Sequence, residues 1–260
     1  MARLSFTPSP TRTAAPLTGV AANPWLAPEA DAALAAVLLA YGRHHFADLP
    51  AVTDLAAWPE EQQEALASEW SRGLCFEVLL GQLKGWILTG RGQGDWHLAL
   101  DETLRPTRVQ TRGPTGQSAD PWPLLATGLW PWFAALTRVA ACRPRVLWSN
   151  AACYWHWYLS ADPLAQALAL LPPAQREPAE CRRQAAQAYV LAREWPAVAA
   201  ADPVSRLIGR NPLYQPVRLR CRGGVSEPMR RICCQRHRLP GLGLCPSCPQ
   251  ALPGLEESHV

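Results

Sequence analysis

The sequence predicts an α+β fold: a mostly helical body, a small antiparallel sheet and a C-terminal loop that carries clustered cysteines. Three observations predict it: long Ala- and Leu-rich stretches, alternating apolar and polar residues within 95–111, and four cysteines within 233–248. With 260 residues, the chain can bury a complete core as one large domain or two small ones.

The chain divides into three parts by composition. Residues 1–24 are polar and rich in proline, which predicts a flexible N-terminal arm. We expect a folded body over 25–220 and a cysteine-bearing C-terminal segment over 221–260.

The first half of the body combines helices with one hairpin. Acidic starts followed by Ala and Leu predict helices at 28–46 and 58–73, with Gly73 as the stop of the second. Residues 75–90 fit a helix or a buried strand equally well. Alternation on both sides of the turn-like DETLRP predicts a β-hairpin at 95–111.

The second half follows a loop at 113–123 that is rich in Gly, Pro and Ser. Apolar segments rich in Trp and Ala then predict helices at 124–141, 145–162, 161–171 and 177–195. Alternation returns at 211–221 and predicts a strand. The twelve tryptophans are expected mainly to fill the core and cover its edges.

We looked in the sequence for a membrane span and for a secretory signal. No apolar run of about 18 residues is present, so we expect no stable membrane insertion. The first 19 residues lack the continuous apolar stretch of a secretory signal, which indicates a cytoplasmic protein.

Nine cysteines in a reducing compartment are not expected to form a disulfide framework. Cys75, Cys142, Cys153 and Cys181 stand alone in apolar or helical text and are expected to be small buried hydrophobes. The remaining cysteines include the only grouping, Cys233, Cys234, Cys245 and Cys248, which we call the cysteine cluster.

Four thiolates within 16 residues suit a soft metal centre, either zinc or iron with inorganic sulfide. Structural zinc usually takes C-x2-4-C pairs, whereas Cys233 and Cys234 are adjacent. Neighbouring side chains tend to diverge, which favours a two-iron centre. A turned backbone could still bring both sulfurs to one metal, so zinc and unligated thiols stay open.

The spacing C-C-x10-C-x2-C, preceded by Arg230 and Arg231, resembles the 2Fe–2S signature of the FhuF family of siderophore ferric-iron reductases. The stretches GRNPLYQPVRLRC and LWSNAACYWHWYL are also similar to that family. The resemblance implies that the cysteine cluster ligates a 2Fe–2S cluster. Cys221 has no place in the motif and is taken as a bystander.

The resemblance also implies a function. Such a protein is a cytoplasmic oxidoreductase that passes one electron from its cluster to Fe(III) held by a siderophore, and so releases Fe(II) for cellular use. Its partners would be the ferric siderophore and a reduced electron donor such as a ferredoxin or flavoprotein, with no nucleic acid.

Positive charge gathers around the cysteines. Between Arg218 and Arg238 there are seven arginines and one acid, so this segment has a net charge of +6. The net charge of the whole chain is +4, so the rest of the chain has a net charge of −2. The residues nearest the cysteines could raise the potential of a cluster or guide an anionic chelate or an acidic donor, or they could be an unspecific solvated face. They are Arg230, Arg231, Arg236, His237 and Arg238.

A chelate pocket is poorly defined by the sequence. Candidate lining residues lie on one predicted helix, with core packing as the alternative: Trp148, Asn150, Trp155, His156 and Tyr158. Cys153 and His156 have the spacing of metal ligands but lack a partner pair, and His44 and His45 are expected at the surface of a helix end.

Two other functions compete with the reductase. A zinc-stabilised module could bind nucleic acid or another partner through its Arg-rich segment, although the helical body shows no nucleic-acid motif. A role in siderophore assembly is disfavoured because no nucleotide-binding signature is present.

Overall fold

The computed structural model describes residues 28–91, 95–112, 118–222 and 225–251. The predicted arm at 1–24 lies outside the described residues. Helices make up 62% of the structure and are joined by two small antiparallel sheets, which confirms the predicted α+β class.

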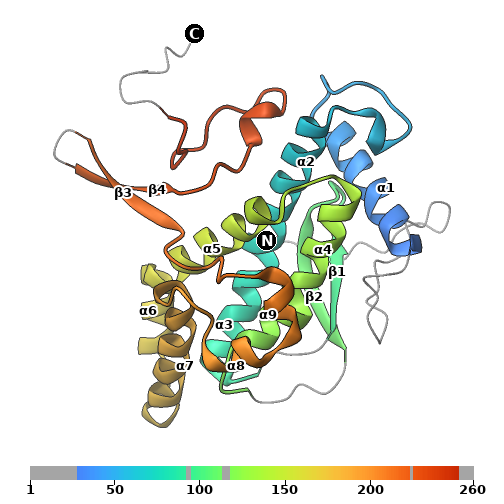
Figure 1. Cartoon of the computed structure of the whole chain (residues 1–260). Coiled ribbons are helices and arrows are strands. Elements are labelled where there is room, and N and C mark those ends of the chain that lie inside the picture. The colour runs from blue at the N-terminus through green and yellow to red at the C-terminus, as the bar shows by residue number, and fades with distance from the viewer. Residues whose placement is uncertain (1–27, 92–94, 113–117, 223–224, 252–260) are drawn as a thin grey trace.

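Helices follow one another along most of the chain (Figure 1). The α-helices are α1 (Pro28–His45), α2 (Glu60–Gly73), α3 (Leu80–Thr89), α4 (Trp130–Val139), α5 (Pro144–Ser160), α6 (Asp162–Ala169), α7 (Pro173–Leu191), α8 (Ala197–Ala201) and α9 (Pro203–Ile208). Shorter segments are the 3-10 turns η2 (Leu55–Ala57) and η5 (Arg236–Arg238) and the π-helices η3 (Leu74–Leu79) and η4 (Leu124–Leu129).

The predicted helix end at Gly73 is wrong. Gly73 has helical angles, φ −58° and ψ −47°, and α2 continues through η3 into α3. One glycine lowers the stability of a helix by about 1 kcal/mol but does not stop it when the next turn is buried, as Leu74 and Cys75 are. The helix ends instead at Gly90, whose φ of 72° requires the left-handed region.

Both sheets are two-stranded antiparallel hairpins. β1 (Asp95–Leu100) pairs with β2 (Pro106–Arg112), as predicted. β3 (Val217–Arg222) falls at the end of the predicted strand and pairs with β4 (Val225–Arg230), which sequence alternation did not predict. β4 contains Pro228, a residue that strands accept only at an edge, and a two-stranded sheet consists only of edges.

Tryptophan side chains fill much of the core, as the sequence predicted. Trp58, Trp70, Trp86, Trp148 and Trp155 are among the largest fully buried side chains. Their indole N–H groups find backbone acceptors in several cases: Trp86 donates to the Ser118 carbonyl at 2.8 Å, and Trp155 donates to that of Ala186 at 3.1 Å. An indole can therefore be buried without losing its hydrogen bond.

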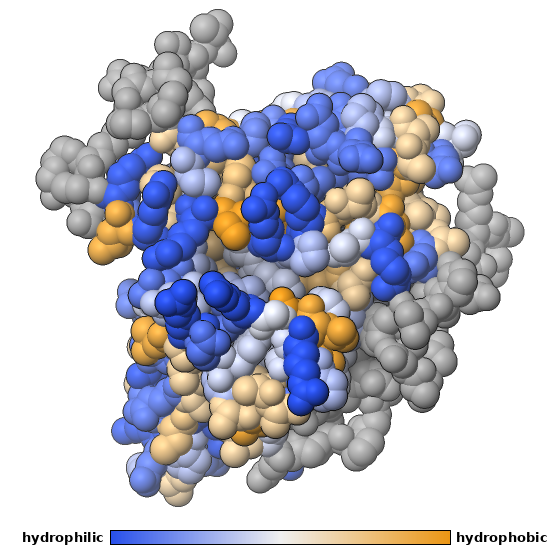
Figure 2. Space-filling model, viewed as in Figure 1, coloured by the Kyte–Doolittle hydropathy of each residue, from blue (hydrophilic) through white to orange (hydrophobic). Residues whose placement is uncertain are grey.

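The C-terminal segment lies beside α2 and α5, and the β3–β4 hairpin projects from the body next to it (Figure 1). On the face shown in Figure 2, hydrophilic side chains predominate around this hairpin, and apolar side chains occur in scattered groups. Within the described part of the chain, no helix combines the length and the apolar character that crossing a bilayer requires.

We predict that Gly42→Ala destabilises the fold by about 1–3 kcal/mol, because the new Cβ would lie 2.5 Å from the Trp58 ring. Gly85→Ala is the matched control. It lies in α3, its Cβ would meet nothing within 4 Å, and it should stabilise the helix by up to about 1 kcal/mol. Urea unfolding of both variants checks this, and an equal effect of the two substitutions would contradict it.

Candidate metal centre

Four thiols from two turns meet in a small buried group of their own. Cys233, Cys234, Cys245 and Cys248 are each 8% exposed or less and pack on one another. The Sγ atoms of Cys234 and Cys245 are 3.9 Å apart, and the Cys248 thiol lies next to Cys233 and raises its pKa. The thiols thus lie as two pairs, each joining one of the adjacent cysteines to one of the C-x2-C cysteines.

The pairing bears on the kind of centre the thiols could hold. Among the described residues, no three His, Cys, Asp or Glu side chains are grouped so that they could hold a single metal ion. A two-iron centre takes two protein ligands on each iron, and the four thiols of the cysteine cluster supply that number.

Local backbone geometry turns N–H groups toward sulfur. Gln235 adopts the left-handed conformation, with φ 64°, and its N–H donates to Cys233 Sγ at 3.3 Å. The N–H of Gln250 donates to Cys248 Sγ at 3.4 Å, and the N–H of Cys248 bonds to the Cys245 carbonyl at 2.9 Å. Such hydrogen bonds stabilise thiolate character and are typical of iron–sulfur sites.

A buried arginine lies beside the thiols. Arg230, at the end of β4, is 5% exposed, and within the described residues no carboxylate pairs with it. Its guanidinium donates to Asn150 Oδ1 and, at 3.4 Å, to Ser149 Oγ, while its backbone N–H donates to the Ser247 carbonyl at 2.9 Å. A buried cation needs nearby negative charge, and the thiolates are the groups placed to supply it.

Asn150 connects this arginine to α2. Its Nδ2 donates to the Ser68 carbonyl at 3.0 Å, to Ser68 Oγ at 3.1 Å and to Ser71 Oγ at 2.9 Å. Ser68 Oγ in turn donates to the carbonyl of Cys234 at 2.7 Å. One fully buried amide therefore joins α5, α2 and the cysteine-bearing segment.

The thiols differ in acidity because their surroundings differ. The hydrogen bond with Cys245 and the charges of Arg230 and Arg72 lower the pKa of Cys234 to about 5, against the opposing effect of burial. The same hydrogen bond and burial raise the pKa of Cys245. Burial raises that of Cys233 to about 11. The charges of Arg230 and Arg72 thus favour the thiolate form of Cys234, which is the form of cysteine that binds metal.

The other predicted basic residues surround the centre from outside. Arg231 is exposed and donates to Gln215 Oε1 at 2.9 Å, and Arg238 is exposed and pairs with Glu61 at 3.3 Å. His237 Nδ1 lies 3.8 Å from Cys233 Sγ, and the N–H of Arg236 bonds toward Cys234. The structure thus gathers the predicted basic residues around the cysteines, with Arg230 alone fully inside.

Residues predicted for a chelate pocket on α5 are placed differently. Trp148 is 1% exposed and packs edge-on against Phe133 at 5.2 Å, and Trp155 is fully buried. Tyr158 is buried and His156 half-buried. Trp148, Trp155 and Tyr158 therefore belong to the core, which was the alternative expected for them, and Asn150 acts as the bridge described above.

The remaining cysteines and histidines follow the sequence predictions with one exception. Cys75 and Cys142 are fully buried, and Cys153 is partly buried. Cys181 is exposed on α7, so its predicted burial is wrong: it lies on the solvent-facing side of an amphipathic helix. The side chain of Cys221 lies outside those described. His44 is exposed at the end of α1, while His45 is partly buried and bonds to the Thr103 carbonyl at 3.0 Å.

Sequence reasoning missed the contribution of α2. Ser68, Ser71 and Arg72 lie on a helix about 160 residues before the cysteines, and no local motif marks them. The only signal was the pair of serines, Ser68 and Ser71, within the second half of this helix.

Buried polar atoms without a hydrogen-bond partner test whether an anionic group fits between the four cysteines. Among the described side chains, the buried Nε atoms of Arg72, Arg230 and Arg236 find no hydrogen-bond acceptor. The charges or backbone of these three residues act on Cys234. Buried donors without partners are rare in proteins, so three of them around four thiols fit a negatively charged centre held by those thiols.

Comparison with known protein families gives a match that coincides with this site. Residues 230–250 match the FhuF 2Fe–2S C-terminal domain, and all four cysteines of the cluster lie inside the match. The matched domain is a 2Fe–2S domain, which confirms the predicted cofactor and disfavours zinc. No curated protein matches the chain.

We predict that Asn150→Ala loosens the cysteine-bearing segment, because it leaves the Arg230 guanidinium and the Ser68 and Ser71 groups without their buried partner, at a cost of about 1–3 kcal/mol or more. Hydrogen exchange of residues 230–250 should speed up. Asn211→Ala is the control: Asn211 is also buried and bonds to the Tyr189 and Ala192 carbonyls, so it should lower global stability without a selective effect on 230–250. Equal protection of that segment in both variants would contradict the bridging role.

Proposed function

We propose that this protein is a cytoplasmic ferric-siderophore reductase, an oxidoreductase that delivers one electron to chelated Fe(III) and thereby releases Fe(II). The proposal rests on one observation: the match to a 2Fe–2S domain covers four buried thiols that pack on one another, and cationic residues lie around them. We also propose Cys233, Cys234, Cys245 and Cys248 as the ligands. A 2Fe–2S cluster bound by them would supply one-electron transfer.

The chemistry of the substrate explains why reduction releases iron. Hydroxamate, catecholate and carboxylate oxygens are hard ligands, and they hold Fe(III) far more strongly than Fe(II). For a one-electron reaction, each 59 mV of potential difference changes the equilibrium constant tenfold. The reduction potential that the protein sets at its centre therefore decides which chelates it can reduce.

The residues of this chain act on that potential through charge and hydrogen bonding. Arg230 places a buried positive charge beside Cys234 and Cys245, and the N–H groups of Gln235 and Gln250 bond to sulfur. Each of these interactions favours the more negative, reduced state and so raises the potential. No acid–base residue is needed.

The exposed arginines supply a docking surface for the electron donor. Arg231 and Arg238 are exposed near the cysteine cluster, and Arg236 is partly exposed. Positive charge around a redox centre speeds the approach of an acidic donor, such as a ferredoxin or flavoprotein.

The reductase proposal predicts a coloured protein. Purified without air, it should be red-brown, contain about two irons and two acid-labile sulfides, bleach with dithionite, and then reduce a ferric chelate in the presence of a colour-forming Fe(II) chelator. Cys234→Ser should abolish the stable colour, with Cys181→Ser on the exposed face of α7 as the control that keeps it. A colourless protein with one zinc would instead support the zinc-module alternative.

We predict that Arg230→Met lowers the reduction potential by roughly 50–100 mV, since removing a unit charge at several ångströms in a medium of effective dielectric about 20 changes the energy by roughly 2 kcal/mol. Arg231→Met removes the same charge from an exposed position, where solvent screens it, and should change the potential little. Spectroelectrochemical titration measures both. Equal shifts would show that net charge, and not the buried guanidinium, sets the potential.

A further inference from the structure

Two segments of the chain bring the thiols of the cysteine cluster together, and a backbone hydrogen bond joins these segments. The first segment follows β4 and carries the two adjacent cysteines, and the second is a turn that carries the C-x2-C cysteines. The N–H of Arg230, at the end of β4, donates to the Ser247 carbonyl inside this turn at 2.9 Å. Each thiol of one segment can therefore lie next to a thiol of the other segment.

The distance between two sulfur atoms indicates which thiols can share an iron. The Sγ atoms of Cys234 and Cys245 are 3.9 Å apart, and we call these two residues the first pair. Two sulfurs that each bind one tetrahedral metal at about 2.3 Å lie about 3.8 Å apart. Thiolates on two different irons point away from each other along the line that joins the irons, so they lie farther apart. The first pair is therefore spaced as two ligands of one iron.

Cys233 and Cys248, which we call the second pair, have the same local hydrogen bonding. Each sulfur accepts from the backbone N–H of the residue two positions later in the chain. The N–H of Gln235 lies 3.3 Å from Cys233 Sγ, and the N–H of Gln250 lies 3.4 Å from Cys248 Sγ. The second pair thus also takes one thiol from each segment, and its two sulfurs have matching surroundings.

The backbone explains why the adjacent cysteines belong to different pairs. The Ser68 hydroxyl donates to the Cys234 carbonyl at 2.7 Å and so fixes this peptide against α2. The left-handed residue that turns the chain comes only afterwards, at Gln235, and neither Cys233 nor Cys234 has a positive φ. Side chains of neighbouring residues outside a turn tend to point to opposite sides of the chain. Cys233 and Cys234 are therefore directed to different irons.

From these observations we infer that the first pair binds one iron of the 2Fe–2S cluster and that the second pair binds the other. Both sets of sequence neighbours, the adjacent cysteines and the C-x2-C cysteines, are then divided between the two irons. The inference rests on the proposed function, because it takes these four cysteines as the ligands of the cluster. The arrangement differs from a zinc knuckle, in which both cysteines of a C-x2-C pair bind the same ion.

The two irons are then unequal. Both thiolates of the second pair accept a backbone N–H, whereas the first pair includes Cys234, whose carbonyl is bonded to α2. Hydrogen bonds to sulfur stabilise the more reduced state of the iron that the sulfur binds. Unequal surroundings keep an added electron on one iron, so the reduced cluster contains one ferric and one ferrous ion. This difference makes the assignment measurable.

NMR spectroscopy of the reduced, cluster-loaded full chain measures the assignment without changing a ligand. The two irons couple antiferromagnetically, so the shifts of cysteine β-protons on the ferric iron decrease with rising temperature and those on the ferrous iron increase. We expect one temperature dependence for the first pair and the opposite one for the second pair. Labelling each cysteine together with the residue before it assigns the signals, because these preceding residues all differ: Ile232, Cys233, Leu244 and Ser247.

Serine variants provide a second measurement, because the effect of a serine ligand on the cluster depends on which iron it binds. Cys233→Ser and Cys248→Ser both change the second pair, so they should shift the reduction potential equally and give the same EPR spectrum. Under either of the other two pairings, Cys233 and Cys248 bind different irons and the two variants should differ. Cys181→Ser, on the exposed face of α7, should change neither property. If a ligand variant loses its cluster, the NMR measurement decides the pairing.

The outcomes distinguish the assignment from the function. A shared temperature dependence of Cys233 with Cys234 or with Cys245 would overturn the assignment, as would different EPR spectra of the two ligand variants. If the signals pair as expected but no ferric chelate is reduced, the reductase proposal fails and the assignment is supported. If ferric chelates are reduced while Cys233 and Cys234 share one temperature dependence, the assignment fails and the reductase proposal is supported.

Discussion

The hydrogen bond between the buried Arg230 guanidinium and Asn150 organises the C-terminal half of this protein. Asn150 is fully buried on α5, and its side-chain amide has a fixed orientation because its nitrogen donates hydrogen bonds to Ser68 and Ser71 of α2. Arg230 ends β4 three residues before Cys233, so fixing its position also fixes where the cysteine-bearing segment begins. A buried cation without a carboxylate partner would be costly, which ties the stability of this arrangement to negative charge on the thiols.

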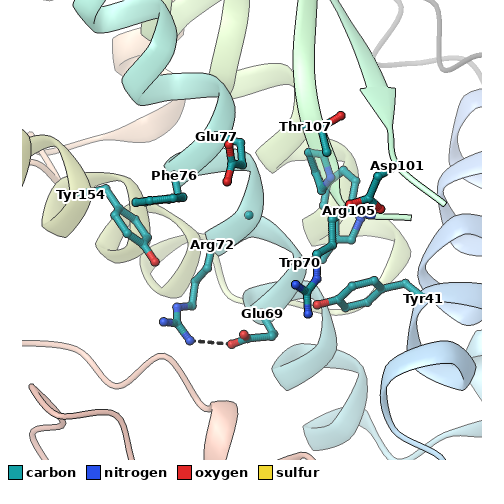
Figure 3. A pocket seen from close by; sticks show the side chains of 12 residues that line it. Tyr41, Glu69, Trp70, Arg72, Phe76, Glu77, Asp101, Arg105, Thr107 and Tyr154 are labelled. Carbon is teal, nitrogen blue, oxygen red and sulfur yellow. Dashed lines mark hydrogen bonds and ion pairs between the residues drawn. The ribbon is translucent and has the colours of Figure 1, made fainter. Parts of the chain in front are cut away.

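The same network places the cysteines with respect to the rest of the molecule. The Ser68 hydroxyl accepts a hydrogen bond from the Asn150 amide and donates one to the Cys234 carbonyl. Through this hydroxyl, α2 is bonded both to Asn150 and to the cysteine-bearing segment. One turn later, the same helix carries Arg72, which pairs with Glu69 at 2.7 Å (Figure 3). Because α2 runs through Gly73 into η3 without a break, Ser68, Arg72 and Phe76 lie on one continuous helix.

Charge is divided between two faces. The exposed arginines of the C-terminal segment give the surroundings of the cysteines a positive field, whereas the α2–η3 helix carries the carboxylates of Glu69 and Glu77. Under the proposed function, an acidic electron donor would meet a surface of complementary charge around the cysteines. The buried Arg230 acts on the thiols from inside the protein, apart from these exposed charges.

The sequence alone determined the helical body, the first hairpin and the cysteine spacing, because periodicity and spacing are local properties of the chain. The kind of cofactor followed from the resemblance of that spacing to a known family, since the spacing by itself left zinc open. It also placed Arg230 near the thiols, since both lie in one short segment. Tertiary structure decided that the helix continues past Gly73, that β4 exists, that Trp148 is core while Asn150 is a bridge, and that Ser68 bonds to the Cys234 carbonyl. These outcomes depend on contacts between residues as far as about 160 positions apart, and local patterns carry no information on which distant side chains meet.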